Sequence, residues 1–588
     1  MKVMKYVFGL VIAFCAITGV SNAQNVLIGG GSSALALELG QAAVVFEDSL
    51  TGANTACIWT KKTANLHTGS TMNAADNRTS PATTESGNVW IVWGPGTGTC
   101  AAPVGTIDVL MNTNLDSVLG DRGYFEVDSS GTPGYVQNLV LASADVVAGD
   151  NLLNANPTTG HTFTDTSTGI PSTVISAING HHWNYAATDI RPEDAKYATF
   201  RALSPCNQWI ARQPFDLIVR STQGLGYANG NTFTDDFAAG KSFHLLDFNI
   251  TGNDPINTSG VVPAYTVSVV GAQPIIVAVG PLTSAAGTGI YLATDIPTYV
   301  LASFAGGVLG RSTDLLGPTG TFPVSFLVRE PLSGTYNTFE FSNINSSQFH
   351  QSQDRVNCSG TSAPGNPLHL LSANGAAGIA ARRRVIGTGQ MTAQIQAGTE
   401  ADERMGYFFW SAANVAGLTN VKYLTVAGVD PIQNSYSNGV LPSSGATGDP
   451  CSGSVTTCPA GTITFKGLNN GDYPIWSALR IVSQSPTPAI VTSLIAAAQT
   501  LNSTQFDFVP LSSLAVWRSH YSMSAINVTT AANGPTINPS TPNDLCNPSG
   551  GALAEAGGDA GGAIILKKAN ADFCADFAVN TGLINKTE

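Results

Sequence analysis

Short apolar runs, each about the length of a strand and bounded by glycine or proline, recur along this chain. Several are apolar throughout, as strands are when both faces of their sheet are covered. The clearest runs are 26–28, 89–93, 107–110, 274–279 and 322–328. Helical spacing of apolar residues is found in other segments, at 33–45, 296–309, 391–395 with its flanks, and 491–501. Strands that alternate with helices predict an α/β fold.

Other parts of the chain have a different composition. They are rich in Thr, Ser, Asn, Gly and Pro and hold several cysteines, and they span 60–105, 128–172, 434–462 and 530–563. We interpret them as large loop and β insertions on a compact α/β frame.

The first residues have the three-part pattern of a secretory signal. Lys2 and Lys5 are followed by an apolar stretch over 7–20, and small residues precede Gln24. We therefore expect residues 1–23 to be a signal peptide and the protein to be periplasmic or secreted. No later apolar run approaches the roughly 20 residues that a membrane-spanning helix needs.

The net charge of the chain argues against large negatively charged partners. Without Lys2 and Lys5, 24 basic residues stand against 39 acidic ones, a net charge of −15. A surface of this sign repels nucleic acid and anionic lipid, so we expect neither as a partner.

The cysteines indicate disulfides. Eight of the nine remain once Cys15 is removed with the signal, and an even number in an exported chain is typical of disulfide bonding. The natural local pairs are Cys57 with Cys100, Cys451 with Cys458, and Cys546 with Cys574, which leaves Cys206 and Cys358 for each other, although the sequence leaves other pairings open. No spacing supports a metal site, and no cofactor is expected.

A candidate anion site follows the apolar run that ends at Val328. Arg329 would lie at the end of a strand, and Ser333, Gly334 and Thr335 at the start of a helix. Helix starts expose unpaired N–H groups, hydroxyls donate further hydrogen bonds, and the planar guanidinium fits an oxyanion. The alternative is an ordinary capped helix with Arg329 on the surface.

In two further stretches, a strand leads into a predicted helix with polar residues at the junction. The strand at 26–28 leads through Gly29, Gly30 and Gly31 into Ser32 and Ser33 at a predicted helix start. Later, Asp189 follows a short apolar segment, and Pro192 marks a turn into another helix.

In these motifs the chain resembles the phosphate-receptor (PstS-like) branch of the periplasmic solute-binding proteins. The family's Arg-x-x-x-Ser-Gly-Thr motif is similar to residues 329–335, its glycine-rich start to 29–33, and its Gly/Ala-Ser-Asp strand end to 187–189. The segments 384–391, 404–411 and 473–476 also resemble family stretches. Pro331 departs from the pattern, since the family commonly has an acidic residue there.

The resemblance implies a type II binding-protein fold, with two lobes and a ligand between them. It implies ligand contacts from these residues: Ser32 or Ser33, Asp189, Arg329, Ser333, Gly334 and Thr335. A carboxylate accepts a hydrogen bond from a protonated oxygen, so Asp189 would favour hydrogen phosphate over sulfate. Its alternative role is an N-cap or a partner for Arg191.

From this resemblance we expect the first lobe to comprise 24–279 and 405–588, and the second 280–404. The protein would be a monomer that carries an oxyanion, phosphate first, to an ABC transporter permease, without enzymatic chemistry.

Two other functions remain open from the sequence. One is a secreted structural or adhesive surface protein that keeps the receptor fold but whose function is carried by the large insertions. The other is a serine hydrolase with Ser333 as nucleophile and a histidine base, the candidates being His181, His182, His350 and His520.

Overall fold

The structure of the chain is a computed structural model. It describes residues 26–51, 57–67, 85–93, 107–113, 147–148, 172–178, 184–189, 265–285, 287–306, 308–319, 322–329, 333–339, 342–343, 382–385, 387–433, 439–454, 457–484, 486–501, 507–514, 516–518, 530–531, 534–535 and 564–566. The expected signal peptide, Arg191, Pro192 and most of the predicted insertions lie outside these residues.

Most of the described strands belong to one 14-stranded sheet, with the order β10-β9-β11-β7-β13-β6-β1-β4-β3-β2-β5 and with β8, β12 and β14 attached beside this path. Its strands are β1 (Val26–Gly31), β2 (Cys57–His67), β3 (Glu85–Trp93), β4 (Ile107–Thr113), β5 (Val147–Ala148), β6 (Tyr185–Thr188), β7 (Tyr265–Gly280), β8 (Asp295–Ile296), β9 (Val324–Arg329), β10 (Arg382–Val385), β11 (Glu403–Phe409), β12 (Lys422–Val426), β13 (Trp476–Gln484) and β14 (Val509–Pro510). Two short pairs join β15 (Val516–Arg518) to β18 (Ile564–Leu566) and β16 (Thr530–Ala531) to β17 (Gly534–Pro535).

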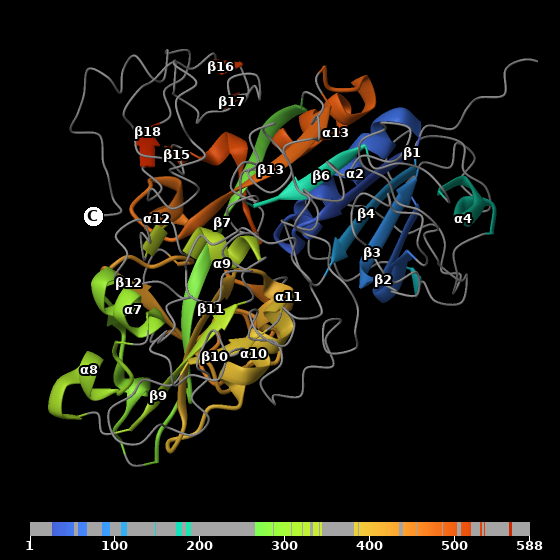
Figure 1. Ribbon diagram of the computed structural model, residues 1–588. Helices are drawn as coiled ribbons and strands as arrows, with labels where there is room; N and C mark the ends of the chain where they lie inside the picture. The colour runs from blue at the N-terminus through green and yellow to red at the C-terminus, as the bar shows by residue number, and fades with distance from the viewer. Residues whose placement is uncertain are drawn as a thin grey trace, which may run out of the picture.

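Helices lie against this sheet (Figure 1). The α-helices are α2 (Ala36–Thr51), α4 (Ser172–Ile178), α7 (Thr298–Ala305), α8 (Thr313–Leu316), α9 (Gly334–Phe339), α10 (Gly387–Gln396), α11 (Ala412–Val415), α12 (Lys466–Asn469) and α13 (Ala489–Gln499). The 3-10 helices are η1 (Ser33–Leu35), η4 (Ile290–Leu292), η5 (Gly317–Thr319) and η9 (Leu511–Ser513). The five predicted apolar runs correspond to β1, β3, β4, β7 and β9, and the four predicted helical segments to α2, α7, α10 and α13. The helix expected after Pro192 lies outside the described residues.

The buried apolar side chains form two large clusters. The first core gathers residues of β1, α2, β6, α13 and the first half of β7, and the second core gathers residues of α7, β9, α9, β11, β12 and the second half of β7. Figure 1 shows the two groups of elements side by side, joined by β7 and β13. The described residues therefore confirm the expected α/β class and its two-lobed arrangement.

The strand β7 connects the two cores. Its first half pairs with β13 and its second half with β11 and β12, in each case antiparallel. Val270 packs in the first core, whereas Ile275 and Val277 pack in the second. Because the second core also takes side chains from 405–475, the exact division of the chain into lobes stays a prediction.

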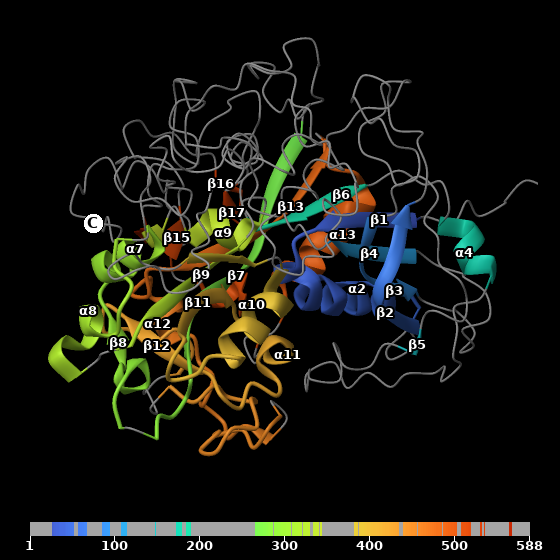
Figure 2. The same cartoon turned by 60° about the horizontal axis from the view of Figure 1, so that its bottom comes forward.

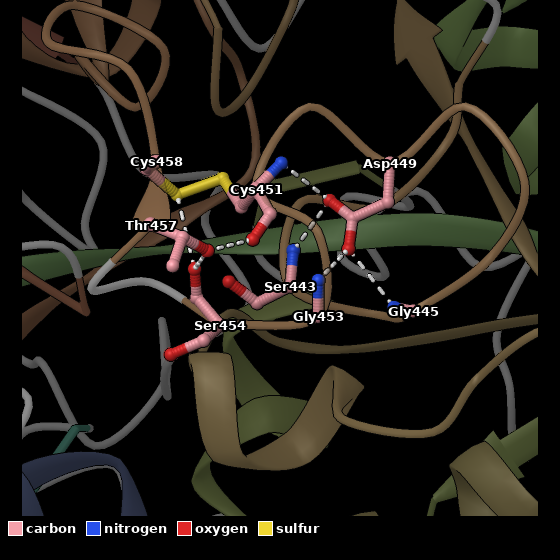
Figure 3. The surroundings of a disulfide bond; sticks show 8 residues. All are labelled: Ser443, Gly445, Asp449, Cys451, Gly453, Ser454, Thr457 and Cys458. Atoms are coloured by element: carbon pink, nitrogen blue, oxygen red, sulfur yellow. Dashed lines mark hydrogen bonds between the residues drawn. A yellow bond between two sulfur atoms is a disulfide. The ribbon is translucent and has the colours of Figure 1, made fainter.

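The predicted insertion at 434–462 is described in large part and contains the predicted disulfide between Cys451 and Cys458 (Figure 3). The Asp449 carboxylate accepts hydrogen bonds from four backbone N–H groups, those of Ser443, Gly445, Cys451 and Gly453. Such a carboxylate replaces the strand pairing that a loop lacks. Cys57 is also disulfide-bonded, whereas Cys100, Cys206, Cys358, Cys546 and Cys574 lie outside the described residues.

Within the described part of the chain, no helix combines the length and the apolar character that crossing a membrane would require.

Candidate oxyanion site

The first group of predicted site residues follows β1. Ser32 is the N-cap of η1, and its hydroxyl oxygen accepts a hydrogen bond from the Ala34 N–H at 3.2 Å. This geometry satisfies one donor of the helix start and leaves the hydroxyl proton able to donate. Ser32 is buried, and Ser33 is half-buried. The backbone N–H of Ser32 donates to the Ala187 carbonyl at 2.7 Å, which places Ser32 beside the end of β6.

Asp189 directly follows β6, the parallel neighbour of β1. Parallel strands end at the same edge of a sheet, so Gly31 pairs with Ala187 and the residues after both strands meet. Asp189 is 1% exposed. Buried carboxylates require hydrogen-bond donors or a positive charge nearby, which is typical of a functional site or a structural ion pair.

Arg329 is the last residue of β9, as predicted. The alternative hypothesis placed its side chain on the surface, and this is wrong because the side chain is fully buried. Its Nη1 donates to Thr388 Oγ1 at 3.1 Å, and its backbone N–H donates to Tyr407 Oη at 3.3 Å. The Tyr407 ring in turn stacks on Phe339 of α9, with ring centroids 4.0 Å apart. The guanidinium is held by α10 and the backbone of Arg329 by β11, so the buried side chain is preorganised and has little freedom left to lose on binding.

Ser333, Gly334 and Thr335 lie at the start of α9, and all three are buried. Ser333 Oγ accepts from the Tyr336 N–H at 3.4 Å, and the Ser333 carbonyl accepts from the Asn337 side-chain amide at 2.8 Å. The predicted helix is therefore present, although it is only six residues long.

The two groups of residues meet between Asp189 and Gly334. A methyl group built on Gly334 would overlap the Asp189 carboxylate, so glycine is required for this close approach. One turn later in α9, Thr338 Oγ1 donates to the Asp189 carbonyl at 3.4 Å. Figures 1 and 2 both show α9 beside the end of β6. The fold thus brings together Asp189, which follows β6, and the Ser-Gly-Thr turn before α9, which the sequence predicted separately.

We expect Gly334→Ala to lower the free energy of unfolding by about 1–3 kcal/mol, because the new methyl group must displace a short and buried side chain. Gly389→Ala in α10 is the matched control, since a methyl group there meets nothing within 4 Å. Adding Asp189→Ala to Gly334→Ala should recover part of the loss. Denaturant unfolding checks these values, and equal stability of the two glycine variants would contradict the close approach.

Sequence reasoning missed Arg480, Ser477 and Thr338. Arg480 is 2% exposed, and its Nη1 donates to the carbonyls of Ala478 at 2.8 Å and of Asp189 at 3.4 Å. Ser477 Oγ donates to Thr338 Oγ1 at 2.9 Å, which joins β13 to α9. The signal in the sequence was one charged residue, Arg480, within the mostly apolar run 475–482.

The histidine candidates for a hydrolase, His181, His182, His350 and His520, lie outside the described residues. In the described ranges, no three or more His, Cys, Asp or Glu side chains are grouped so that they could hold a metal ion.

No family model matches the chain, and no curated protein matches it. Among solved structures, it is similar to PstS from Borrelia burgdorferi, with 10% identity over 83% of this chain and 99% of that chain and a TM-score of 0.30. It is similar to the phosphate-binding protein from Stenotrophomonas maltophilia, with 12% identity over 84% and 92% and a TM-score of 0.30. It is also similar to an ABC-type phosphate transport receptor from Vibrio cholerae, with 12% identity over 42% and 72% and a TM-score of 0.25.

Proposed function

We propose that this protein is an exported solute-binding protein of the PstS-like type, which captures an oxyanion between its two lobes, with phosphate as the preferred ligand. The supporting observation is the approach of the Asp189 carboxylate to Gly334, between the buried residues Ser333 and Thr335. These residues come from opposite cores, so a ligand that contacts both would stabilise the closed arrangement.

In this proposal each side chain has a distinct role. Arg329 supplies the positive charge, and the hydroxyls of Ser32 or Ser33, Ser333 and Thr335 donate hydrogen bonds to the anion. Asp189 accepts a hydrogen bond from the ligand's protonated oxygen. Sulfate carries no such proton near neutral pH and would meet the carboxylate with its full charge, so hydrogen phosphate is preferred.

The protein would act as a monomer without a cofactor and without chemical turnover, and would deliver its ligand to an ABC transporter permease. The boundaries of the lobes, 24–279 with 405–588 and 280–404, belong to the same proposal.

Titration calorimetry of the wild-type protein with phosphate, sulfate and an organic phosphate tests the proposal. We expect phosphate to bind more tightly than sulfate, and phosphate at 100 times its dissociation constant to stabilise the folded protein by about 2.7 kcal/mol. Absence of binding heat and of thermal stabilisation with all three compounds would instead favour the structural or adhesive surface protein. Turnover of a chromogenic ester, abolished by Ser333→Ala, would favour the hydrolase.

A further inference from the structure

Arg480 is a buried cation outside the predicted ligand set. It lies in β13, where it pairs with Thr188, the last residue of β6 and the neighbour of Asp189. Burial of a guanidinium is unfavourable unless its charge and its N–H groups are compensated by partners, and Arg480 is buried next to the candidate site.

Two side chains contact the backbone of Asp189. The ladder between β6 and β13 ends at Thr188, one residue before Asp189. Arg480 Nη1 and Thr338 Oγ1 both donate to the Asp189 carbonyl, each at 3.4 Å. A carbonyl oxygen has two lone pairs and can accept both.

These two donors come from different parts of the molecule. Thr338 belongs to α9, which packs in the second core, and would leave Asp189 if the lobes opened. Arg480 lies in β13, a strand paired directly with β6, and would stay in place. Its Nη1 is also anchored by the Ala478 carbonyl at 2.8 Å, which fixes the guanidinium on its own strand.

We propose that Arg480 is a positioning residue that holds Asp189 in the orientation that accepts a hydrogen bond from the ligand's protonated oxygen, and that it thereby sets the preference for protonated over fully ionised oxyanions. This inference rests on the proposed function. Arg480 acts through Asp189, so its loss should weaken phosphate binding more than sulfate binding.

The test measures the dissociation constants of phosphate and sulfate for wild type, Arg480→Met, Arg480→Lys and Asp189→Asn. We expect Arg480→Met to lower the sulfate-to-phosphate ratio of dissociation constants by up to about tenfold, the effect of one hydrogen bond from a charged group. Arg480→Lys, which keeps the charge and one donor, should recover part of the ratio. In the Asp189→Asn background, Arg480→Met should leave the ratio unchanged.

Circular dichroism establishes that each variant is folded, and Arg404→Lys, an arginine bound to Asp402 at 2.8 Å in the second lobe, is the control. If Arg480→Met does not fold, Arg480→Lys tests the proposal instead. We expect its sulfate-to-phosphate ratio of dissociation constants to be about threefold lower than that of the wild type. An unchanged ratio in the folded Arg480 variants, or equal weakening of both anions, overturns the positioning role alone. Failure of the wild type to bind either anion overturns the proposed function and this inference with it.

Discussion

Replacing Arg329 with alanine should weaken phosphate binding about 30-fold or more. The guanidinium is fully buried, and truncation of a buried charge that binds an ion removes about 2–5 kcal/mol. Arg329→Lys should lose less, about tenfold, because lysine keeps the charge but not the planar pair of donors. Titration calorimetry at constant ionic strength measures both effects.

The control for this prediction is Arg404→Ala. Arg404 lies on β11, which pairs with β9, and it binds Asp402 at 2.8 Å toward the opposite end of β9 from Arg329. Its removal should leave the affinity within about twofold, because this half-buried ion pair lies toward the other end of β9 and does not contact the predicted site residues. Equal affinities of the wild type and Arg329→Ala would remove Arg329 from the site.

Stability should also depend on pH through two buried groups that hold the η4 turn. Glu403 Oε1 accepts from the Ile290 N–H at 2.7 Å, and Lys422 Nζ donates to the Tyr291 carbonyl at 2.6 Å. Burial raises the pKa of Glu403 to about 7; hydrogen bonds from the Ile290 backbone and the Ser312 side chain lower it, and the charge of Glu400 raises it. Burial lowers the pKa of Lys422 to about 8.

Each shift defines a pH window. Between about pH 4.5 and 7, Glu403 is ionised in the unfolded chain but protonated in the folded one, so the free energy of unfolding should fall by about 3 kcal/mol as pH rises. Between about pH 8 and 10.5, Lys422 is charged in the unfolded chain but neutral in the folded one, so stability should rise again by a similar amount. From these two groups we therefore predict that the free energy of unfolding has a minimum between pH 7 and 8.

Urea unfolding across this range checks the curve. Glu403→Gln should flatten the falling part, and Lys422→Met should flatten the rising part. Asp472→Asn, at an exposed acid, is the control and should leave both parts unchanged. A curve for Glu403→Gln that parallels the wild type would show that another group titrates there.

The sequence predicted secondary-structure elements correctly where the pattern depends on neighbouring residues. The run before Arg329 predicted β9, and the Ser-Gly-Thr turn predicted the start of α9. It placed the start of β7 too late, at Pro274, whereas the strand begins at Tyr265. Gly271 and Pro274 by themselves indicate the end of a strand. In the structure, β7 continues through both residues, because it pairs with neighbouring strands there. The helix expected at 296–309 ends at Ala305, before Gly306.

The sequence by itself determined the elements, the α/β class and the candidate residues, because apolar periodicity and short turns are properties of neighbouring residues. Only the tertiary structure decided that Asp189 meets α9, 149 positions away at Thr338, and that Arg480 reaches the same carbonyl from β13. Contacts over such separations depend on strand order and on the packing of two cores. No local pattern encodes that order, because burial of a charged side chain is decided by what the rest of the chain places around it.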